Sequence, residues 1–334
     1  MLYITTRDDV NLSTAHRALV NENIPDGGLY APHRFPQYTP EEVKQLKNKT
    51  FFQIVEEVLG QFFPLRMDNN PLIGDYPAFY KTLEMSHRTV IAELWHNRSG
   101  TYKDFEAYIM NRLADKVGVD VCASEWPQIA LRIAVIFALY GELLRCEHIN
   151  GDQAVDISAW NDDFATPIAA VYCRKMGLPI NMIICTCGSN NDIWEFIHKG
   201  TVNTAMLSSS QRNGLERLIH TTLGAEESRS FADCCSNNKT YVVDEEKVSV
   251  MNMGLFCVVA GKDRSGQVIN SLFRMNTYIA DNYTALSYGG VQDYRAKLGG
   301  NGVALIIAYN SPIHCLEDIF AATGLDENKI KSFL

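Results

Sequence analysis

The stretch Gly177-Leu-Pro-Ile-Asn-Met-Ile-Ile-Cys185 decides the fold class. It follows a helical pattern over residues 166–176, and its glycine and proline favour a turn before a short apolar strand over residues 180–185. A second strand is predicted from the continuous apolar run Val303-Ala-Leu-Ile-Ile-Ala308, because strands buried on both faces of a parallel sheet lack polar alternation. Helix and buried strand in succession indicate an α/β protein whose parallel sheet is flanked by helices.

Other segments carry helix or strand signals. Thr39-Pro-Glu-Glu42 is typical of a helix start, with the threonine as cap and acidic residues in the first turn. The segment 129–144 contains two charged residues and is shorter than the roughly 20 apolar residues of a membrane span, so a buried helix is expected there and no membrane association. Apolar spacing predicts helices over residues 40–46, 50–62, 105–117 and 126–144, strand over 248–260, and loops over 225–239 and 263–266.

Composition narrows the classes of partner. The 334 residues include 30 basic and 39 acidic side chains, so the formal net charge is −9, and no basic run exists that would follow a nucleic-acid backbone. The start of the chain lacks a secretory signal pattern, so a cytoplasmic location is expected. Nine scattered cysteines indicate reduced thiols, and their spacing does not predict a metal site.

Two N-terminal segments resemble the opening of the threonine synthases, a family of pyridoxal-phosphate (PLP) enzymes of fold type II. They are Tyr3-Ile-Thr-Thr-Arg7 and Ile24-Pro-Asp-Gly-Gly-Leu-Tyr-Ala-Pro32. The corresponding family patterns are Tyr-x-Ser-Thr-Arg-Gly and Ala-Pro-Asp-Gly-Gly-Leu-Tyr-Val-Pro. Asp-Gly-Gly alone is common in turns, but two matching segments at the family's spacing go beyond a turn signal.

A third segment carries the candidate catalytic residue. Glu93-Leu-Trp-His-Asn-Arg-Ser-Gly-Thr-Tyr-Lys-Asp104 resembles the family's Glu-Leu-Phe-His-Gly-Pro-Thr-x-x-Phe-Lys-Asp, whose lysine forms the internal aldimine with PLP. The resemblance therefore implies that Lys103 is the aldimine and cofactor-binding lysine. Such a lysine needs a neutral amine, which burial or a nearby cation favours. The alternative is a solvated lysine in a polar loop.

The next matching segment indicates a missing domain. Residues Trp126-Pro-Gln-Ile-Ala-Leu-Arg-Ile-Ala-Val-Ile-Phe137 are similar to the family's Asn-Trp-x-Arg-x-x-x-Gln-x-x-Tyr-Tyr-Phe. Only about twenty residues separate this segment from Lys103. In the family that interval holds a Thr-Ser-Gly-Asp-Thr-Gly loop and most of a small α/β domain that closes over the substrate. The resemblance implies a small domain that is reduced or absent here.

Two further positions are candidate contacts of the cofactor. Ser158-Ala-Trp-Asn-Asp-Asp-Phe-Ala165 resembles the region of the family's Gly-Asn-Phe-Gly phosphate loop, which makes Asn161 a candidate. Two aspartates stand in this loop, and like charges at about 4 Å repel by about 4 kcal/mol at an effective dielectric of about 20, unless the carboxylates turn outward and cap the helix. Ala308-Tyr-Asn-Ser-Pro-Ile-His314 aligns loosely with Thr-Ala-His-Pro-x-Lys-Phe, whose threonine faces the pyridine nitrogen, which makes Ser311 the other candidate.

Two functions follow from the resemblance. One is a threonine synthase-like pseudoenzyme that binds a small molecule in the old cleft, or a protein partner such as a second copy of itself. The alternative is an active PLP-dependent lyase that converts O-phosphohomoserine or a related amino acid, with Lys103 as proton shuttle. The resemblance divides the chain into an N-terminal region, residues 1–90, and a truncated PLP-enzyme-like α/β domain, residues 91–334.

Overall fold

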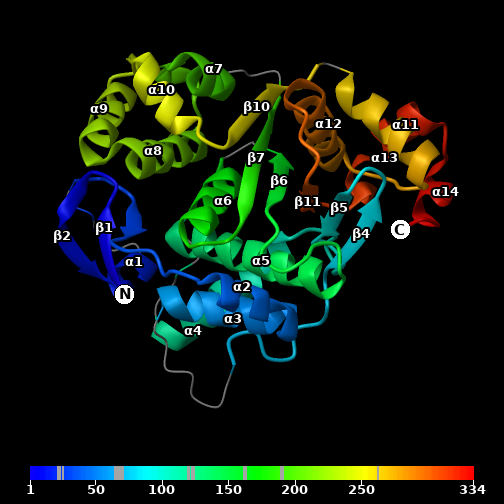
Figure 1. Cartoon of the computed structure of the whole chain (residues 1–334), viewed down its shortest axis with the longest axis horizontal. Helices are drawn as coiled ribbons and strands as arrows, with labels where there is room; N and C mark the ends of the chain where they lie inside the picture. The colour runs from blue at the N-terminus through cyan, green and yellow to red at the C-terminus, as the bar shows by residue number, and fades with distance from the viewer. Residues whose placement is uncertain are drawn as a thin grey trace.

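A six-stranded sheet forms the centre of the molecule (Figure 1). The computed structural model describes residues 1–20, 24, 26–63, 71–118, 121, 125–160, 164–188, 192–261 and 263–334. All neighbouring strands of the sheet are parallel except the last two, which are antiparallel. The predicted α/β fold with a mostly parallel sheet flanked by helices is therefore confirmed. In spatial order the strands are β10 (Leu255–Val259), β7 (Ile180–Cys187), β6 (Val155–Trp160), β11 (Val303–Ala308), β5 (Thr89–Glu93) and β4 (Lys81–Met85).

Each face of the sheet belongs to its own hydrophobic cluster. Val90 and Leu305 lie in a cluster that includes α3 (Phe51–Phe62), α5 (Glu125–Arg145) and α6 (Ala165–Lys175). Their neighbours Ile91 and Ile306 lie in the other cluster, with α11 (Arg264–Asn276) and α12 (Asn282–Leu298). This alternation follows from the pleat, which points successive side chains to opposite faces. Helices on both faces explain why β11 is apolar throughout and why β5 is buried along its whole length.

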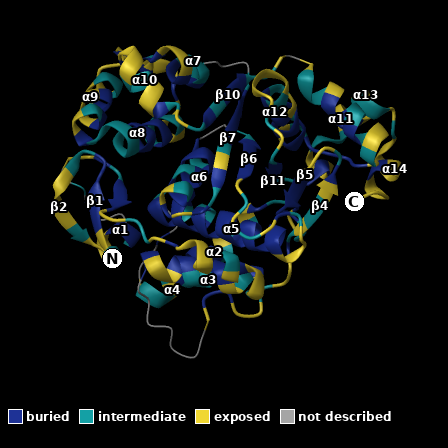
Figure 2. Ribbon diagram, viewed as in Figure 1, coloured by how far each residue is buried: buried dark blue, intermediate teal, exposed yellow. Residues whose placement is uncertain are grey.

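Helix α5 is buried along nearly its whole length (Figure 2). It is long and apolar enough to cross a membrane by length and composition alone. Its apolar residues instead pack against α3 and α6 inside the fold. The prediction of a buried helix over residues 126–144 is confirmed.

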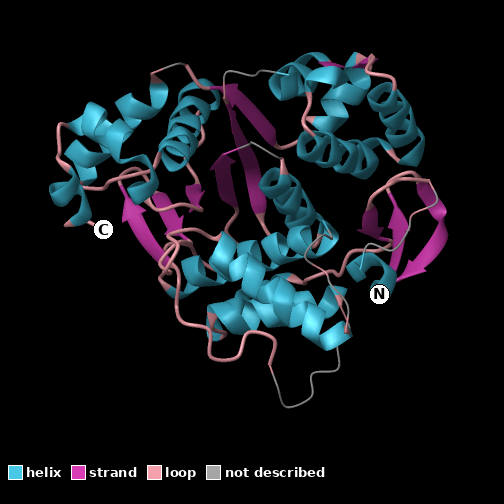
Figure 3. Cartoon of the chain, turned by 180° about the vertical axis from the view of Figure 1, so that it is seen from behind, coloured by secondary structure: helices cyan, strands magenta, loops and turns pink. Residues whose placement is uncertain are grey.

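The remaining elements surround the sheet on both sides (Figure 3). A three-stranded antiparallel sheet, in the order β2, β1, β3, forms near the N-terminus, and β8 pairs with β9. The bounds are β1 (Leu2–Thr5), β2 (Asp8–Thr14), α1 (Ala15–Val20), β3 (Tyr30–Pro32), α2 (Pro40–Gln45), η1 (Leu46–Asn48), α4 (Lys103–Val117), α7 (Asp192–Lys199), β8 (Thr201–Asn203), η2 (Thr204–Met206), α8 (Ser209–Leu223), α9 (Ala225–Ser236), β9 (Thr240–Val242), α10 (Glu245–Met251), η3 (Pro312–Cys315), α13 (Leu316–Thr323) and α14 (Glu327–Lys331).

Local signals placed most elements correctly and failed at three. The helix start at Thr39 is confirmed, because its side chain accepts a hydrogen bond from the Glu42 amide in a capping box. The loop predicted over residues 225–239 is wrong, since most of it is α9. The strand predicted over 248–260 is wrong in its first half, which belongs to α10, and correct in its second half, which is β10. The loop predicted over residues 263–266 is wrong after Asp263, because α11 begins at Arg264.

The chain passes directly from α4 into α5. The two helices are separated by residues 118–124 alone. The described part of the chain contains one parallel sheet, and it is the central one. The division at residues 90 and 91 stays a prediction. One hydrophobic cluster takes residues from both sides of that division.

Candidate functional site

A cavity of about 400 Å³ lies at the C-terminal ends of β6 and β11. Ligands of parallel α/β sheets bind at this edge. A more open groove of about 810 Å³ lies along α11 and α13, but the smaller cavity is the candidate site because it contains Lys103 and the strand ends. It is lined by Tyr102, Lys103, Glu106, Arg132, Trp160, Thr166, Tyr283, Thr284, Ile307, Tyr309 and Asn310.

Lys103 is the first residue of α4, and its exposed side chain lines the cavity. The preceding turn is fixed by Asn97, whose side-chain amide donates to the Thr101 carbonyl at 2.6 Å and accepts from the Thr101 amide at 3.2 Å. The Asp104 carboxylate accepts a hydrogen bond from the Ser99 amide at 3.2 Å. Within the described ranges the Lys103 amine has no hydrogen bond or ion pair. The residue carried over from the resemblance is therefore placed at the cavity and is available to a ligand.

The other two candidates have different positions. Ser311 is buried and caps η3 through a hydrogen bond from the Ile313 amide at 3.4 Å, and its own amide donates to the Gly100 carbonyl at 2.8 Å. It joins the loop after β11 to the turn before Lys103, and its neighbour Asn310, rather than Ser311, lines the cavity. Asn161 lies outside the described residues.

Arg132 organises one wall of the cavity. Its guanidinium donates to the Thr166 hydroxyl at 3.2 Å and lies 3.7 Å from the Glu106 carboxylate. It also lies over the rings of Tyr102 and Tyr309, at 5.7 and 5.2 Å from their centroids. The hydroxyls of Thr166 and Tyr309 are 2.8 Å apart and share a hydrogen bond. This network covers the first turn of α6 with side chains that bind one another.

The position of this arginine departs from the family pattern. Counted from Trp126, the family's Asn-Trp-x-Arg-x-x-x-Gln places arginine at position 128 and glutamine at position 132. Here the two types are exchanged, with Gln128 and Arg132. The exchange moves the positive charge by about one helical turn. Gln128 now lines a separate cavity of about 240 Å³, to which Arg132 also contributes.

Solved structures share this architecture over nearly the whole chain. PLP-bound threonine synthase from Brucella melitensis superposes with a TM-score of 0.81 and 17% identity, over 98% of this chain and 92% of that one. Yeast threonine synthase gives a TM-score of 0.78 and 12% identity, over 99% and 93%. Residues 2–73 match the family described as the threonine synthase N terminus. The chain has the fold of the threonine synthases, and its N-terminal segment matches that family.

Curated threonine synthases and threonine synthase-like proteins match this chain over shorter stretches. Threonine synthase-like 1 of Mus musculus is 31% identical over 75 residues, which is 22% of this chain and 10% of that protein. Threonine synthase of Pseudomonas aeruginosa is 24% identical over 126 residues, which is 35% of this chain and 27% of that protein. The matched stretches thus span at most about a quarter of these relatives' own length.

The cavity of this chain fits one part of PLP and not the other. Lys103 offers an amine to an aldehyde. A phosphate dianion needs free donors and excess positive charge. At the first turn of α6, however, the Thr166 hydroxyl and the Arg132 guanidinium already bind neighbouring side chains. Ala165 stands where the family's loop ends in glycine. The described lining carries two cations and the Glu106 carboxylate, a net charge of +1. These residues do not fit the phosphate group.

The N-terminus of α12 at the cavity depends on a buried acid. The Asp281 side chain is 4% exposed and accepts hydrogen bonds from the amides of Tyr283 at 2.9 Å and Thr284 at 3.3 Å, and from the Thr284 hydroxyl. Burial raises the pKa of Asp281 above its ordinary value, although these hydrogen bonds oppose the shift. The folded state therefore binds more protons at this site than the unfolded chain does.

The native protein should lose stability as the pH rises toward the raised pKa of Asp281. We expect Asp281→Asn to abolish this loss. Between about 3.9, the pKa of an unfolded aspartate, and the higher pKa in the folded protein, the free energy of unfolding falls with increasing pH because the carboxylate must ionise while buried. Asparagine keeps an oxygen for the α12 amides and does not titrate. Urea denaturation from pH 3 to pH 6 should show the variant gaining stability relative to the native protein. Parallel curves would contradict the raised pKa.

Proposed function

We propose that this chain is a non-catalytic threonine synthase-like protein that binds a small molecule in the cavity beside Lys103. The observation that supports this proposal most strongly is the passage from α4 into α5 through residues 118–124 alone. Seven residues are too few to form a domain that closes over the cavity. A ligand bound at Lys103 would therefore remain open to solvent on that side.

The open side of the cavity limits the reactions that the site can support. Reactive intermediates on amino acids survive in enzymes whose active sites close and exclude water. Here the cavity still offers charged, polar and aromatic groups around Lys103. Such a mixture is typical of small-molecule sites, which range from about 300 to 1,000 Å³. Binding without turnover is the function that these features support together.

The positions of the charged groups support the same proposal. Arg132 lies against Glu106 and Thr166, so the positive charge nearest the first turn of α6 is already compensated within the protein. Loading the cavity with PLP would require this arrangement to open. A ligand with one negative charge matches the lining better than a phosphate dianion does. The proposed protein thus keeps the fold of the family without its cofactor. Self-association and a cytoplasmic location remain predictions.

The second candidate function is an active PLP-dependent lyase that acts on O-phosphohomoserine or a related amino acid. One observation favours it, namely that Lys103 keeps its place at the start of a helix and at the cavity. The two candidates differ in a direct assay. Purified protein would be incubated with PLP and O-phosphohomoserine, and phosphate release would be followed over time. We expect release at the rate of a protein-free control. Release that disappears in Lys103→Ala would establish the lyase instead.

A further inference from the structure

Three side chains that line the cavity each have a buried polar atom without a hydrogen-bond partner among the described residues. These atoms are the Tyr102 hydroxyl, the Trp160 indole nitrogen and the Glu106 Oε2 atom, which has only the ion pair with Arg132 at 3.7 Å. Buried polar groups in folded proteins are nearly always paired, since an unpaired one is costly. Three such atoms around one cavity, two from the start of α4 and one from the end of β6, indicate a bound molecule that supplies their partners.

The unpaired atoms specify the polar groups of that molecule. Burial, together with the nearby Glu106 carboxylate, raises the pKa of the Tyr102 hydroxyl well above its ordinary value, so this group stays protonated and can donate. The indole N–H of Trp160 is a donor only, whereas an ionised Glu106 accepts only. The ligand therefore needs acceptors for two donors and one donor for Glu106.

The charged groups specify the net charge of the ligand. Lys103 and Arg132 against Glu106 leave one positive charge in excess. The N-terminus of α4 adds partial positive charge beside Lys103, whereas the Asp281 carboxylate caps the first amides of α12. Because Arg132 is engaged with Glu106 and Thr166, the exposed amine of Lys103 is the cation that a ligand can pair. A single carboxylate satisfies this charge.

The aromatic side chains specify the shape of the ligand. Trp160 and Tyr283 lie with ring centroids 5.3 Å apart and ring planes inclined at 38°. Both line the cavity, and Tyr283 remains 45% exposed. Exposed aromatic faces bind flat rings by offset stacking or edge contacts. The cavity thus provides a surface for an aromatic ring beside the amine of Lys103.

We propose that the cavity binds an aromatic monocarboxylate whose ring carries a hydroxyl group. This inference rests on the proposed function and names the class of ligand. The carboxylate pairs with the Lys103 amine, the ring packs against Trp160 and Tyr283, and the ring hydroxyl donates to Glu106. The Tyr102 hydroxyl and the Trp160 indole N–H donate to oxygen atoms of the bound molecule.

The test uses 4-hydroxybenzoate as the probe, with binding measured by titration calorimetry on the native protein. We expect saturable binding with a dissociation constant of about 1 mM or tighter. Tyr102→Phe should weaken binding about tenfold, the effect of one lost hydrogen bond. The same variant should raise the melting temperature of the ligand-free protein by about 2 °C, because it removes a buried hydroxyl that has no partner. If Tyr102 had only a structural role, Tyr102→Phe would not weaken binding while raising the melting temperature.

Tyr140→Phe is the matched control. Its hydroxyl donates to the Gln153 carbonyl at 2.9 Å, and Tyr140 does not line the cavity. This variant should bind the probe as the native protein does and melt at a lower temperature. Lys103→Gln, at an exposed position, tests the carboxylate contact without threatening the fold. It should weaken binding of 4-hydroxybenzoate and leave binding of the uncharged 4-hydroxybenzamide unchanged.

Two results would overturn the inference. One is the absence of saturable binding of 4-hydroxybenzoate, and the other is equal binding by the native protein and Tyr102→Phe. Neither result affects the proposed function, which fails separately if added PLP forms an aldimine on Lys103. Tighter binding of trans-4-hydroxycyclohexanecarboxylate, which has the same charge without a flat ring, would also count against an aromatic ligand.

Discussion

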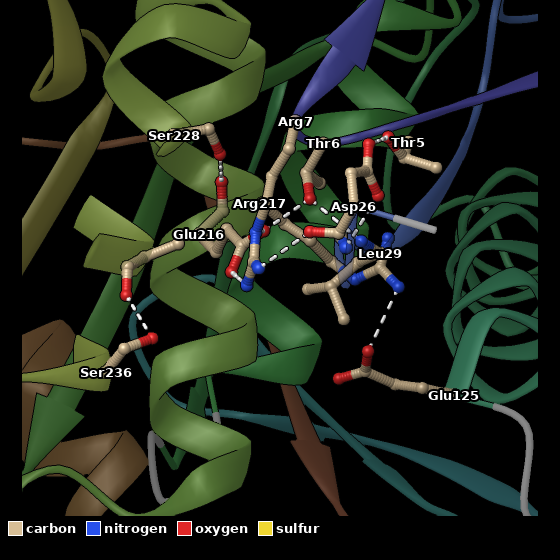
Figure 4. A network of polar contacts seen from close by, with 12 residues as sticks. Thr5, Thr6, Arg7, Asp26, Leu29, Glu125, Glu216, Arg217, Ser228 and Ser236 are labelled. Atoms are coloured by element: carbon tan, nitrogen blue, oxygen red, sulfur yellow. Dashed lines mark hydrogen bonds and ion pairs between the residues drawn. The ribbon is translucent and has the colours of Figure 1, made fainter. Parts of the chain in front are cut away.

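Replacing Glu216 by alanine should lower the free energy of unfolding by about 3 kcal/mol. The Glu216 side chain is buried in α8 and accepts three hydrogen bonds from the N-terminal segment (Figure 4). One comes from the Thr6 hydroxyl at 2.5 Å, and two come from the Arg7 guanidinium at 2.9 Å each. Its removal leaves a partly buried arginine without its carboxylate, which costs more than the net worth of the pair. Urea denaturation measures the loss.

Two further variants make this test specific. Glu226→Ala, at an exposed position in α9, should change stability by less than about 0.5 kcal/mol. Glu216→Gln keeps the shape of the side chain but turns one acceptor into a donor, so an intermediate loss is expected. If Glu216→Ala and Glu226→Ala unfold at the same urea concentration, the network does not hold the N-terminal segment to α8.

Trp126→Ala should lower the free energy of unfolding by about 4 kcal/mol. The substitution removes the largest fully buried side chain in the described core and leaves a cavity there. The indole N–H donates to the Tyr3 hydroxyl at 3.1 Å, and that hydroxyl donates to the Phe62 carbonyl at 2.9 Å. The ring also meets those of Tyr3, Phe62 and Tyr172, with centroids 5.8, 5.4 and 6.2 Å away. One side chain thus joins β1, α3, α5 and α6. Thermal or urea unfolding followed by circular dichroism measures the effect.

The matched variant is Trp126→Phe. It keeps an aromatic ring at the centre of this contact and removes the hydrogen bond to Tyr3. Its loss in free energy of unfolding should therefore be less than half of that of Trp126→Ala. A similar loss for both variants would assign the stabilisation to the hydrogen bond rather than to the packed volume. A loss below about 1 kcal/mol for Trp126→Ala would contradict the contact itself.

The central sheet was predictable because its signals are local. Residues 303–308 are apolar without interruption, and residues 180–185 are apolar except at Asn181; the structure buries most of these residues between helices on both faces. Helix α9 was missed because it is mostly polar, and only small residues and Phe231 mark its buried face. The segment 248–260 divides at Gly254, whose φ of +77° ends the turn after α10, and composition alone does not reveal that break.

The site was predictable only at Lys103, through a motif that surrounds it. Its neighbours in the cavity come from segments far apart in the chain, including Trp160, Tyr283 and Tyr309, and no local pattern brings these together. Arg132 had a readable signal, the exchange of arginine and glutamine in the α5 motif. Its consequence, the network at the first turn of α6, required the structure.

The visible absorption spectrum of the purified protein with added PLP tests the central claim most directly. A protein that keeps the threonine synthase fold without its cofactor should show only the spectrum of free PLP at every cofactor concentration. The same spectrum should be recorded for Lys103→Ala, which lacks the amine that an internal aldimine requires. Identical spectra for the two proteins are the predicted result. A long-wavelength aldimine band in the native protein that is absent from Lys103→Ala would contradict the account.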